Sequence, residues 1–177
     1  MATKANNKKA LVYLWTGTGA GKTTSALGAA LRQVGHRHNV IIIQFMKGRK
    51  YVGEYKIMKR LKPNYQIYQF GRKEWVDVLH PSKKDKTLAK KGLAFAYKAI
   101  QQKPNLLVLD EINYAVALGL IEEQEVLKLL DTAHLSTAVY LTGRFATLQL
   151  INRADFVNEV VTVKMPAKII PRKGVDY

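Results

Sequence analysis

Short runs of apolar and β-branched residues alternate along the chain with longer segments in which apolar residues recur every three or four positions. Short runs of this kind are typical of buried strands, and the longer segments are typical of amphipathic helices. Strands are predicted at 10–15, 39–45, 66–70, 106–109, 137–141 and 156–163. Helices are predicted at 22–34, 50–61, 85–102, 122–131 and 147–154.

This alternation predicts an α/β fold in which a mostly parallel sheet carries helices on both sides. The helix 85–102 illustrates the pattern, because Leu88, Phe95 and Ala99 fall on one stripe that would be buried. Ligands of such sheets bind at the carboxyl ends of the strands. The residues that follow each predicted strand are therefore the first place to look for a site.

Length and composition favour one globular domain over the whole chain, because 177 residues with 47% hydrophobic content suffice for one core and are few for two. Residues 1–9 are expected to be flexible, and 164–177 form a C-terminal tail. The first residues are polar and basic, and no window approaches the roughly 18 apolar residues of a membrane span. A soluble, cytoplasmic protein is therefore expected.

The chain contains no cysteine, which excludes disulfides, thiolate metal sites and cysteine nucleophiles. Its four histidines lack the spacing of zinc ligands, apart from the close pair His36 and His38, and are expected to be ordinary surface or loop residues. The lack of cysteine also fits a reducing cytosol.

The net charge of +16 is concentrated in the middle of the chain. Residues 47–91 contain fourteen Lys or Arg against four Asp or Glu, whereas 104–163 contain three against eight. A solvated basic face is one explanation of this distribution, and binding of a nucleic acid or of an anionic small molecule is an equally good one. Charge alone leaves these alternatives open.

The segment TGTGAGKTT at 16–24 lies between a predicted strand and a predicted helix. It matches G-x-x-x-x-G-K-[ST] except that Thr16 occupies the first glycine position. A helix start presents free N–H groups to phosphate oxygens, Lys22 supplies a cation, and the Thr23 hydroxyl is placed to coordinate Mg²⁺. The residues expected to contact phosphate are Gly17, Thr18, Gly19, Ala20, Gly21, Lys22, Thr23 and Thr24.

Two later strands end in residues that suit the same site. LLVLDE at 106–111 delivers Asp110 and Glu111 to a strand end, where a metal on a bound triphosphate would lie. AVYLTGR delivers Arg144, for which a phosphate contact and a surface ion pair are equally compatible with the sequence. With the phosphate loop, these features predict a P-loop NTPase-like, RecA-like domain that binds a nucleoside triphosphate and magnesium.

The reaction itself is left open by these parts. A hydrolase would use Glu111 to activate water, and a nucleic-acid-stimulated ATPase of the RecA-like type would share the loop, the acid pair and the basic surface. A nucleotide-binding regulatory module would keep the fold without catalysis. The guanine-reading N-K-x-D pattern is absent from the sequence, which favours adenine. The shortness of the chain makes nucleic acid the less favoured partner.

Longer stretches carry a resemblance that covers nearly the whole chain. GTGAGKTTSALGAALR, VIIIQFMKG, GEYKIMKRL, LLVLDEINYAVALGLI and LTGRFATLQLINRADFVNEV, with the ending RKGVDY, occur in this order. The sequence thus resembles the ATP:corrinoid adenosyltransferases of the P-loop type. Ala20 stands where many relatives carry lysine, and the tail is shorter and lacks the histidine expected after Lys164.

The resemblance implies transfer of the 5′-deoxyadenosyl group of ATP to the reduced cobalt of a corrinoid, such as cob(I)alamin or cob(I)yrinic acid a,c-diamide. Triphosphate would be the leaving group, in adenosylcobalamin synthesis or salvage. It further implies catalytic roles for Lys22, Thr23 and Glu111, with Mg²⁺ held by Thr23, Asp110 and Glu111. Reduced cobalt is itself the nucleophile, which agrees with the lack of a nucleophile and base arrangement in the sequence.

The family also implies aromatic residues that displace the lower axial ligand of cobalt. The corresponding stretch is YQFGRKEWVDV, which offers Phe70 and Trp75 at a spacing that departs from the family pattern. Phe70 is equally compatible with the end of a core strand, whereas the charged neighbours of Trp75 favour a functional role. The basic segments 47–50, 56–62 and 83–91 are compatible with contact to corrin carboxamides, with contact to an acidic reductase and with no partner at all. An acidic, flavodoxin-like reductant is the expected partner in electron delivery. A homodimer is a further possibility.

Overall fold

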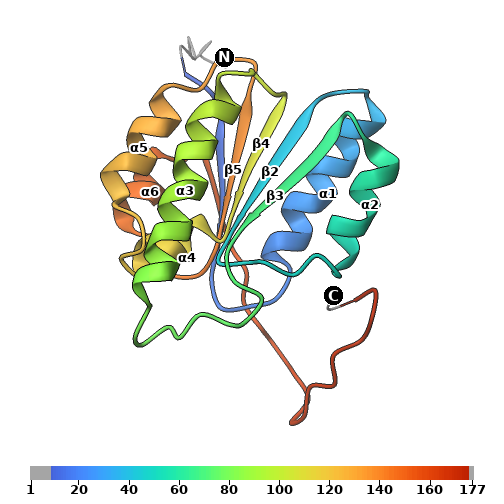
Figure 1. Ribbon diagram of the computed structural model, residues 1–177, viewed down its shortest axis with the longest axis vertical. Helices are drawn as coiled ribbons and strands as arrows, with labels where there is room; N and C mark the ends of the chain where they lie inside the picture. The colour runs from blue at the N-terminus through green and yellow to red at the C-terminus, as the bar shows by residue number, and fades with distance from the viewer. Residues whose placement is uncertain (1–8, 176–177) are drawn as a thin grey trace, which may run out of the picture.

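The structure of the protein is a computed structural model that describes residues 9–175. Within this range the strands form a six-stranded sheet with the order β3-β2-β4-β5-β1-β6, and every neighbouring pair is parallel (Figure 1). The strands are β1 Val12–Thr16, β2 Val40–Phe45, β3 Tyr65–Phe70, β4 Leu106–Asp110, β5 Ala138–Thr142 and β6 Phe156–Glu159. The predicted α/β fold with a parallel sheet is confirmed.

The helices lie on both faces of this sheet, as expected. They are α1 Lys22–Gly35, α2 Gly53–Leu61, α3 Lys83–Ile100, α4 Ile112–Ala117, α5 Glu123–Asp131 and α6 Leu148–Arg153. Helix α3 starts two residues before the predicted position because Ser82 and Asp85 form a capping box. Helix α4 was missed, since its six residues are too few to show a clear helical period.

Two apolar clusters hold the layers together. One cluster joins α1 and α2 to one face of the sheet through residues such as Ala26, Ala30 and Ile42. The other cluster joins the helices α3, α4, α5 and α6 to the opposite face through residues such as Phe45 and Leu93. Figure 1 shows α1 and α2 on one face and α3 to α6 on the other. Strands β2 and β4 are buried on both faces, which explains why their sequences are nearly continuous apolar runs.

The C-terminal segment leaves β6 and runs past the carboxyl ends of the strands (Figure 1). Strand β6 ends at Glu159 rather than at 163, because the Val160 carbonyl accepts a hydrogen bond from Gly19 N in the phosphate loop. Residues 164–175 form neither helix nor strand, and Pro171 comes to lie near Tyr51. The predicted flexibility of 1–9 mostly concerns residues that lie outside the described range.

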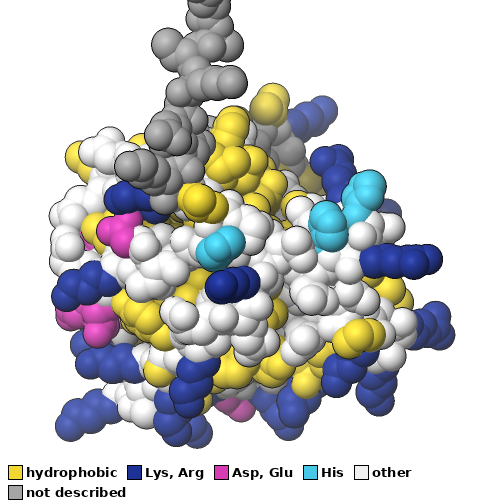
Figure 2. All heavy atoms as spheres, turned by 90° about the horizontal axis from the view of Figure 1, so that it is seen from above, with side chains coloured by type: hydrophobic (Ala, Val, Ile, Leu, Met, Phe, Trp, Pro, Cys, Tyr) yellow, Lys and Arg dark blue, Asp and Glu magenta, His cyan; other side chains and the backbone are white. Residues whose placement is uncertain are grey.

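The opposite end of the molecule, at the amino ends of the strands, shows dispersed charge (Figure 2). Lysine and arginine side chains surround this face without merging into one patch, and histidine side chains lie among them. His36, His38, His80 and His134 are all exposed, as expected for surface or loop residues. Among the described residues, no helix is long and apolar enough to cross a membrane.

Candidate active site

The phosphate loop connects β1 to α1 and ends at Gly21, which precedes the first turn of the helix. Gly21 has a φ of 107° and open space where a side chain would project, so the left-handed backbone requires glycine there. The Lys22 ammonium donates to the Gly19 carbonyl and thus folds back over the loop. Burial lowers the pKa of Lys22; Glu111 opposes this shift, and Arg144 and Lys47 add to it.

Gly17 and Gly19 are needed for a contact within the chain, and their predicted contact with phosphate stays a prediction. The sequence suggested that both allow close approach of phosphate, but the crowding at these positions comes from the chain itself. A Cβ on Gly19 would lie 2.8 Å from the Val160 carbonyl oxygen, and one on Gly17 would also collide with it. The segment after β6 therefore packs directly on the loop, and these two glycines permit that contact.

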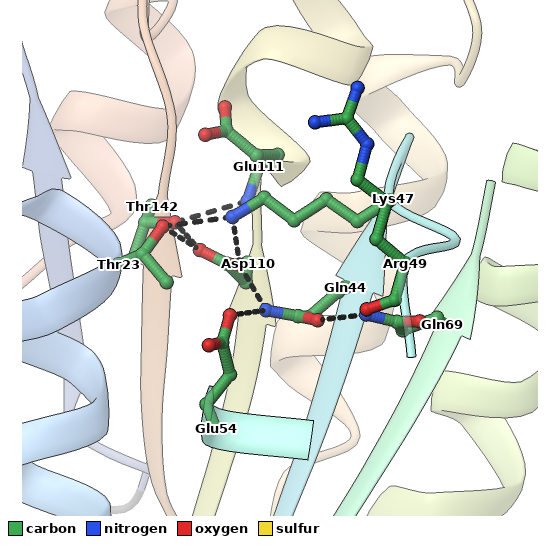
Figure 3. A network of polar contacts seen from close by, with 9 residues as sticks. All are labelled: Thr23, Gln44, Lys47, Arg49, Glu54, Gln69, Asp110, Glu111 and Thr142. Atoms are coloured by element: carbon green, nitrogen blue, oxygen red, sulfur yellow. Dashed lines mark hydrogen bonds and ion pairs between the residues drawn. The ribbon is translucent and has the colours of Figure 1, made fainter. Parts of the chain in front are cut away.

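Asp110 is the centre of the polar network at the end of β4 (Figure 3). Its side chain is fully buried and accepts hydrogen bonds from Thr23 Oγ1 at 2.8 Å and Thr142 Oγ1 at 2.7 Å through one oxygen. The other oxygen accepts from Gln44 Nε2 at 3.0 Å and forms an ion pair with Lys47 Nζ at 2.7 Å. The ends of β2, β4 and β5 and the start of α1 thereby meet at one carboxylate.

The electrostatics of this network are dominated by two opposing effects. Burial acts to raise the pKa of Asp110, but the Lys47 ammonium and the hydrogen bonds from Lys47, Thr142 and Thr23 outweigh it and hold the pKa below its usual value. Burial likewise acts to lower the pKa of Lys47, but the negative charges of Asp110 and Glu111 outweigh this effect and raise the pKa above its usual value. Both groups are therefore charged at neutral pH.

Glu111 follows Asp110 with an unusual backbone. Its φ of 65° lies in the left-handed region, and its N–H donates to Thr142 Oγ1 at 3.0 Å. Met46 and Phe145, which lie beyond the ends of β2 and β5, also have positive φ values of 56°. Such backbone costs about 1–3 kcal/mol per residue and is common at functional sites. Three of the five non-glycine residues with positive φ in the described part of the chain thus lie at the sheet edge of the phosphate loop, and the other two, Arg37 and Lys103, precede strands at the opposite edge.

The Glu111 carboxylate is only partly covered and lies near the cations of the loop. Burial raises the pKa of Glu111; Lys47 opposes this shift, Asp110 adds to it, and Lys22 and Arg144 oppose it. Arg144 is exposed, and its positive charge acts on the pKa values of both Lys22 and Glu111. The structure thus brings together Lys22, Thr23, Asp110, Glu111 and Arg144, as the sequence predicted, while the roles of these residues stay predictions.

Lys47 is the site residue that sequence reasoning missed. Besides the ion pair with Asp110, its ammonium donates to Thr23 Oγ1 at 3.0 Å, so it touches both the loop and the acidic strand. It lies in QFMKG, directly after β2, and the sequence treated it only as part of a basic segment. The rule that ligands bind beyond strand ends was the available signal.

A cavity of about 590 Å³ opens beside this network, at the ends of β2 and β3. It is lined by Met46, Lys47, Gly48, Arg49, Tyr51, Val52, Glu54, Gln69, Arg72, Glu74, Trp75 and Pro171. Its volume is typical of small-molecule sites. Lys47 belongs to both the cavity and the Asp110 network, so the two parts of the site share one side chain.

Trp75 lies on the rim of this cavity, with 80% of its surface exposed. The Arg49 guanidinium sits 4.1 Å from the centre of its ring, and Arg49 Nε donates to the Lys73 carbonyl at 2.9 Å. The loop that carries Trp75 is anchored by Arg72, which forms a two-point ion pair with Asp85 at the start of α3. Trp75 is thus placed at the cavity, and its functional role stays a prediction.

Phe70 lies apart from the cavity. Its ring packs 5.5 Å from that of Phe95, and a Cβ on Gly92 of α3 would lie 3.0 Å from Phe70 Cβ. Of the two interpretations that the sequence left open, this placement favours the end of a core strand. The reason is the alternation of side chains along β3, which turns Phe70 toward α3 and its neighbour Gln69 toward the cavity.

No cluster of three or more His, Cys, Asp or Glu that could hold a metal occurs within residues 9–175. A glycine-rich loop between a buried strand and a helix, with an acid at the end of a nearby strand, instead defines a P-loop nucleotide-binding α/β protein. The loop Gly17–Gly21 and Asp110 of β4 have this arrangement, since Asp110 bonds to Thr23 directly after the loop. The predicted P-loop class is thus confirmed.

Similarity to known proteins narrows this class to one family. A family model described as ATP:corrinoid adenosyltransferase BtuR/CobO/CobP matches residues 8–177. The chain is 30% identical over 178 residues to the corrinoid adenosyltransferase CobA of Salmonella typhimurium, covering 98% of this chain and 89% of that protein. It is 33% identical over 183 residues to a corrinoid adenosyltransferase of Sinorhizobium, covering 100% and 84%.

A corrinoid adenosyltransferase of Escherichia coli is 29% identical over 177 residues, with coverage of 98% and 89%. The chain therefore belongs to the ATP:corrinoid adenosyltransferase family, and the resemblance seen in the sequence is confirmed. It is an enzyme of this type, with ATP and a corrinoid as substrates and adenosylation of the corrinoid as its activity.

Proposed function

We propose that the protein transfers the 5′-deoxyadenosyl group of ATP to Co(I) of a corrinoid and releases triphosphate. The cobalt lone pair forms the bond to C5′, and the electron pair of the broken C5′–O bond leaves on the triphosphate. The observation that carries this proposal is the meeting of a phosphate loop and a large cavity at one sheet edge, with Lys47 in both. That arrangement suits two substrates whose reacting atoms must come together.

The residues of the loop are suited to hold a leaving group. Negative charge grows on the triphosphate as the C5′–O bond breaks, and fixed cations and N–H groups stabilise such charge. Lys22, Lys47 and Arg144 supply cations around the loop, and the start of α1 supplies N–H groups. The protein provides no nucleophile, so its contribution is positioning and electrostatic stabilisation.

The residues around Asp110 fit a magnesium ion. Thr23 Oγ1 and Asp110 Oδ1 lie 2.8 Å apart, and Glu111 adds a second carboxylate, so the donors are all oxygens, as Mg²⁺ prefers. The Lys47 ammonium bonds to the same two side chains, Thr23 and Asp110, which supports a cation site there. Thr23 and Asp110, with Glu111, would hold Mg²⁺, which neutralises charge on the phosphates when bound.

The cavity would hold the corrin ring, with Trp75 beneath it. An apolar indole there would exclude water and the lower axial ligand, which eases reduction of Co(II) to Co(I). An acidic, flavodoxin-like protein would deliver the electron to the basic surface near the cavity. The cytoplasm is the proposed location, and a homodimer the proposed assembly.

An anaerobic assay tests the proposal with ATP, Mg²⁺ and chemically reduced cobalamin. The expected result is the absorbance of a cobalt–carbon bond together with one triphosphate per product. Without corrinoid, little ADP should form. ADP formation that is stimulated by single-stranded DNA and lost in Glu111→Gln, without any cobalt–carbon product, would favour the RecA-like ATPase instead.

A further inference from the structure

Gln69 lines the cavity, and its orientation is set through the buried Gln44, which contacts two carboxylates. Gln44 Nε2 lies 3.0 Å from Asp110 Oδ2 and 3.5 Å from Glu54 Oε1. Ionised carboxylates only accept hydrogen bonds, so this atom must be the amide nitrogen. Gln44 Oε1 therefore faces the other way, toward Gln69 (Figure 3).

The orientation of Gln69 follows from the same logic. Its Nε2 donates to Gln44 Oε1 at 2.9 Å and to the Arg49 carbonyl at 3.3 Å, and both of these atoms are acceptors. Gln69 Oε1 is left buried and without a hydrogen-bond partner among residues 9–175. An unpaired buried acceptor costs about 1–3 kcal/mol. A ligand with an N–H group would recover that cost.

The cations of the cavity wall are already engaged. Lys47 is paired with Asp110, and Arg72 is paired with Asp85. Arg49 lies over an aromatic ring and donates to a backbone carbonyl. Among the cations that line the cavity, Lys47 and Arg72 are thus neutralised by carboxylates, and Arg49 keeps its positive charge.

The carboxylates of the wall are engaged much less. Within the described residues, neither Glu54 nor Glu74 has an ion-pair partner within 4.0 Å, and Glu54 receives only the long bond from Gln44. Within the described part of the cavity wall, the two carboxylates without an ion-pair partner, Glu54 and Glu74, therefore outnumber the one such cation, Arg49, and Gln69 Oε1 adds an unpaired acceptor. Such a wall favours ligands that present N–H donors and disfavours ligands that present carboxylates.

We propose that this cavity selects corrinoids whose peripheral side chains are carboxamides over corrinoids whose side chains are free carboxylates. The inference rests on the proposed function, because it assumes that the corrin occupies this cavity. Carboxamide N–H groups donate to Glu54 and Glu74, and to Gln69 Oε1 after a side-chain rotation, since that atom is covered. Carboxylates offer no donor and are repelled by both glutamates.

Two corrinoids without a nucleotide loop provide the test. Cobinamide carries carboxamides where cobyrinic acid a,c-diamide carries mostly free carboxylates. Equilibrium binding of both, as Co(III) forms with the same axial ligands, and kcat/KM of both after reduction should favour cobinamide at least ~10-fold, or about 1.4 kcal/mol. The net charge of +16 alone predicts the opposite order. Equal affinities, or tighter binding of the diamide, would overturn the inference.

Variants locate the source of the preference. The double variant Glu54→Gln/Glu74→Gln should bind the carboxylate ligand better and reduce the preference to less than ~3-fold, since its charge repulsion is gone. Gln69→Leu should weaken cobinamide binding more than diamide binding. Gln66→Leu is the matched control, because Gln66 lies on β3 outside the cavity lining and should leave the ratio unchanged.

The ratio of the affinities for cobinamide and cobyrinic acid a,c-diamide separates selectivity from damage to the fold, because a merely structural effect lowers both affinities together. A preference that survives in the double variant would assign the selectivity elsewhere and overturn the inference. If neither corrinoid binds or reacts, the proposed function fails and the inference fails with it. If both react at equal rates, only the inference fails.

Discussion

The two halves of the site differ in how they are built. On the phosphate side, Asp110 is fully buried, and its partners come from strand ends and a helix start. On the cavity side, residues 71–82 form no helix or strand, and Trp75 and Leu79 are about four-fifths exposed. The phosphate side is thus preorganised, whereas the cavity side has room to adapt to a large substrate. Catalysis of this kind requires fixed charge at the leaving group.

The largest effect should come from breaking the ion pair between Lys47 and Asp110, which lies where the phosphate side and the cavity side of the site meet. Lys47→Met leaves the buried Asp110 without its cation, and loss of one member of such a pair costs about 3 kcal/mol of folding free energy. Urea denaturation measures this cost. Gln66→Leu, which lies away from the network, serves as control. A stability close to that of the wild type would contradict the importance of the pair.

Lys47→Met should also reverse the way in which the Asp110 carboxyl makes the free energy of unfolding depend on pH. In the wild type the lowered pKa of Asp110 contributes stability above the unfolded value of about 3.9, and this contribution is lost as the pH falls. In Lys47→Met the largest effect that opposes burial is removed, so we expect the pKa of Asp110 to rise above its unfolded value although the hydrogen bonds from Thr142 and Thr23 remain. Stability should then decline as the pH rises above about 4. Parallel stability curves for the two proteins would contradict this account.

The second prediction concerns the leaving group. Lys22→Ala and Thr23→Ala should each lower kcat/KM at least ~100-fold, or about 2.7 kcal/mol, because each removes a group that stabilises developing charge. Steady-state kinetics with preformed cob(I)alamin measure the effect. Ser25→Ala, an exposed position in the next turn of α1, is the control and should be unaffected. Normal ATP affinity and turnover in both variants would refute the assignment of the loop.

Sequence and structure agree most closely on the phosphate side. Its loop is one continuous motif, and the apolar run of β4 marks where Asp110 emerges, so local patterns suffice. Lys47 was missed because its partner is 63 positions away, and the register of β2 against β4 that aligns them is a tertiary feature. The fold was predictable for a similar reason, since buried parallel strands have apolar runs that are visible in the sequence.

The cavity side was less predictable because it depends on which face each side chain takes. Phe70 and Gln69 are neighbours, yet only Gln69 lines the cavity. The sequence singled out the aromatic residue, since a glutamine carries no recognisable motif. The reason for Gly17 and Gly19 was also hidden, because Val160 lies more than a hundred positions away along the chain. Such contacts depend on how the folded chain brings the segment after β6 back to the phosphate loop, which no local sequence pattern reveals.

The third prediction tests whether Trp75 acts on the lower face of the corrin. Trp75→Ala should reduce turnover from cob(II)alamin with a protein reductant about tenfold more than turnover from preformed cob(I)alamin, because only the first requires displacement of the lower ligand. The ratio of the two rates is the measured quantity. Trp75→Phe keeps an apolar ring and should retain most of the ratio. Equal losses in both assays would make Trp75 a general binding contact.

The smallest expected effect concerns the anchor of the cavity loop. Asp85 caps α3 through Ser82 and holds Arg72, whose side chain lines the cavity. Asp85→Ala removes the capping box and should lower the stability by about 1 kcal/mol, as measured by urea denaturation at pH 7. Asp131→Ala breaks the two ion pairs that the half-exposed Asp131 carboxylate forms with Lys9 and Arg153, and should cost less than ~0.5 kcal/mol. A smaller loss for Asp85 than for Asp131 would mean that the loop is held by other contacts.

The pH dependence of this difference gives the sharper test of the anchor. The hydrogen bond with Arg72, against the opposing effect of burial, lowers the pKa of Asp85 to about 2, and the hydrogen bonds from Ser82 add to the shift. A lowered pKa contributes stability above the unfolded value of about 3.9, and this contribution disappears as the pH falls toward 2. The difference in unfolding free energy between wild type and Asp85→Ala should therefore shrink over that range, while ATP affinity at pH 7 stays unchanged in the variant. A weakened ATP affinity would show that the cavity loop and the phosphate loop are coupled, and that the two halves of the site are not built independently.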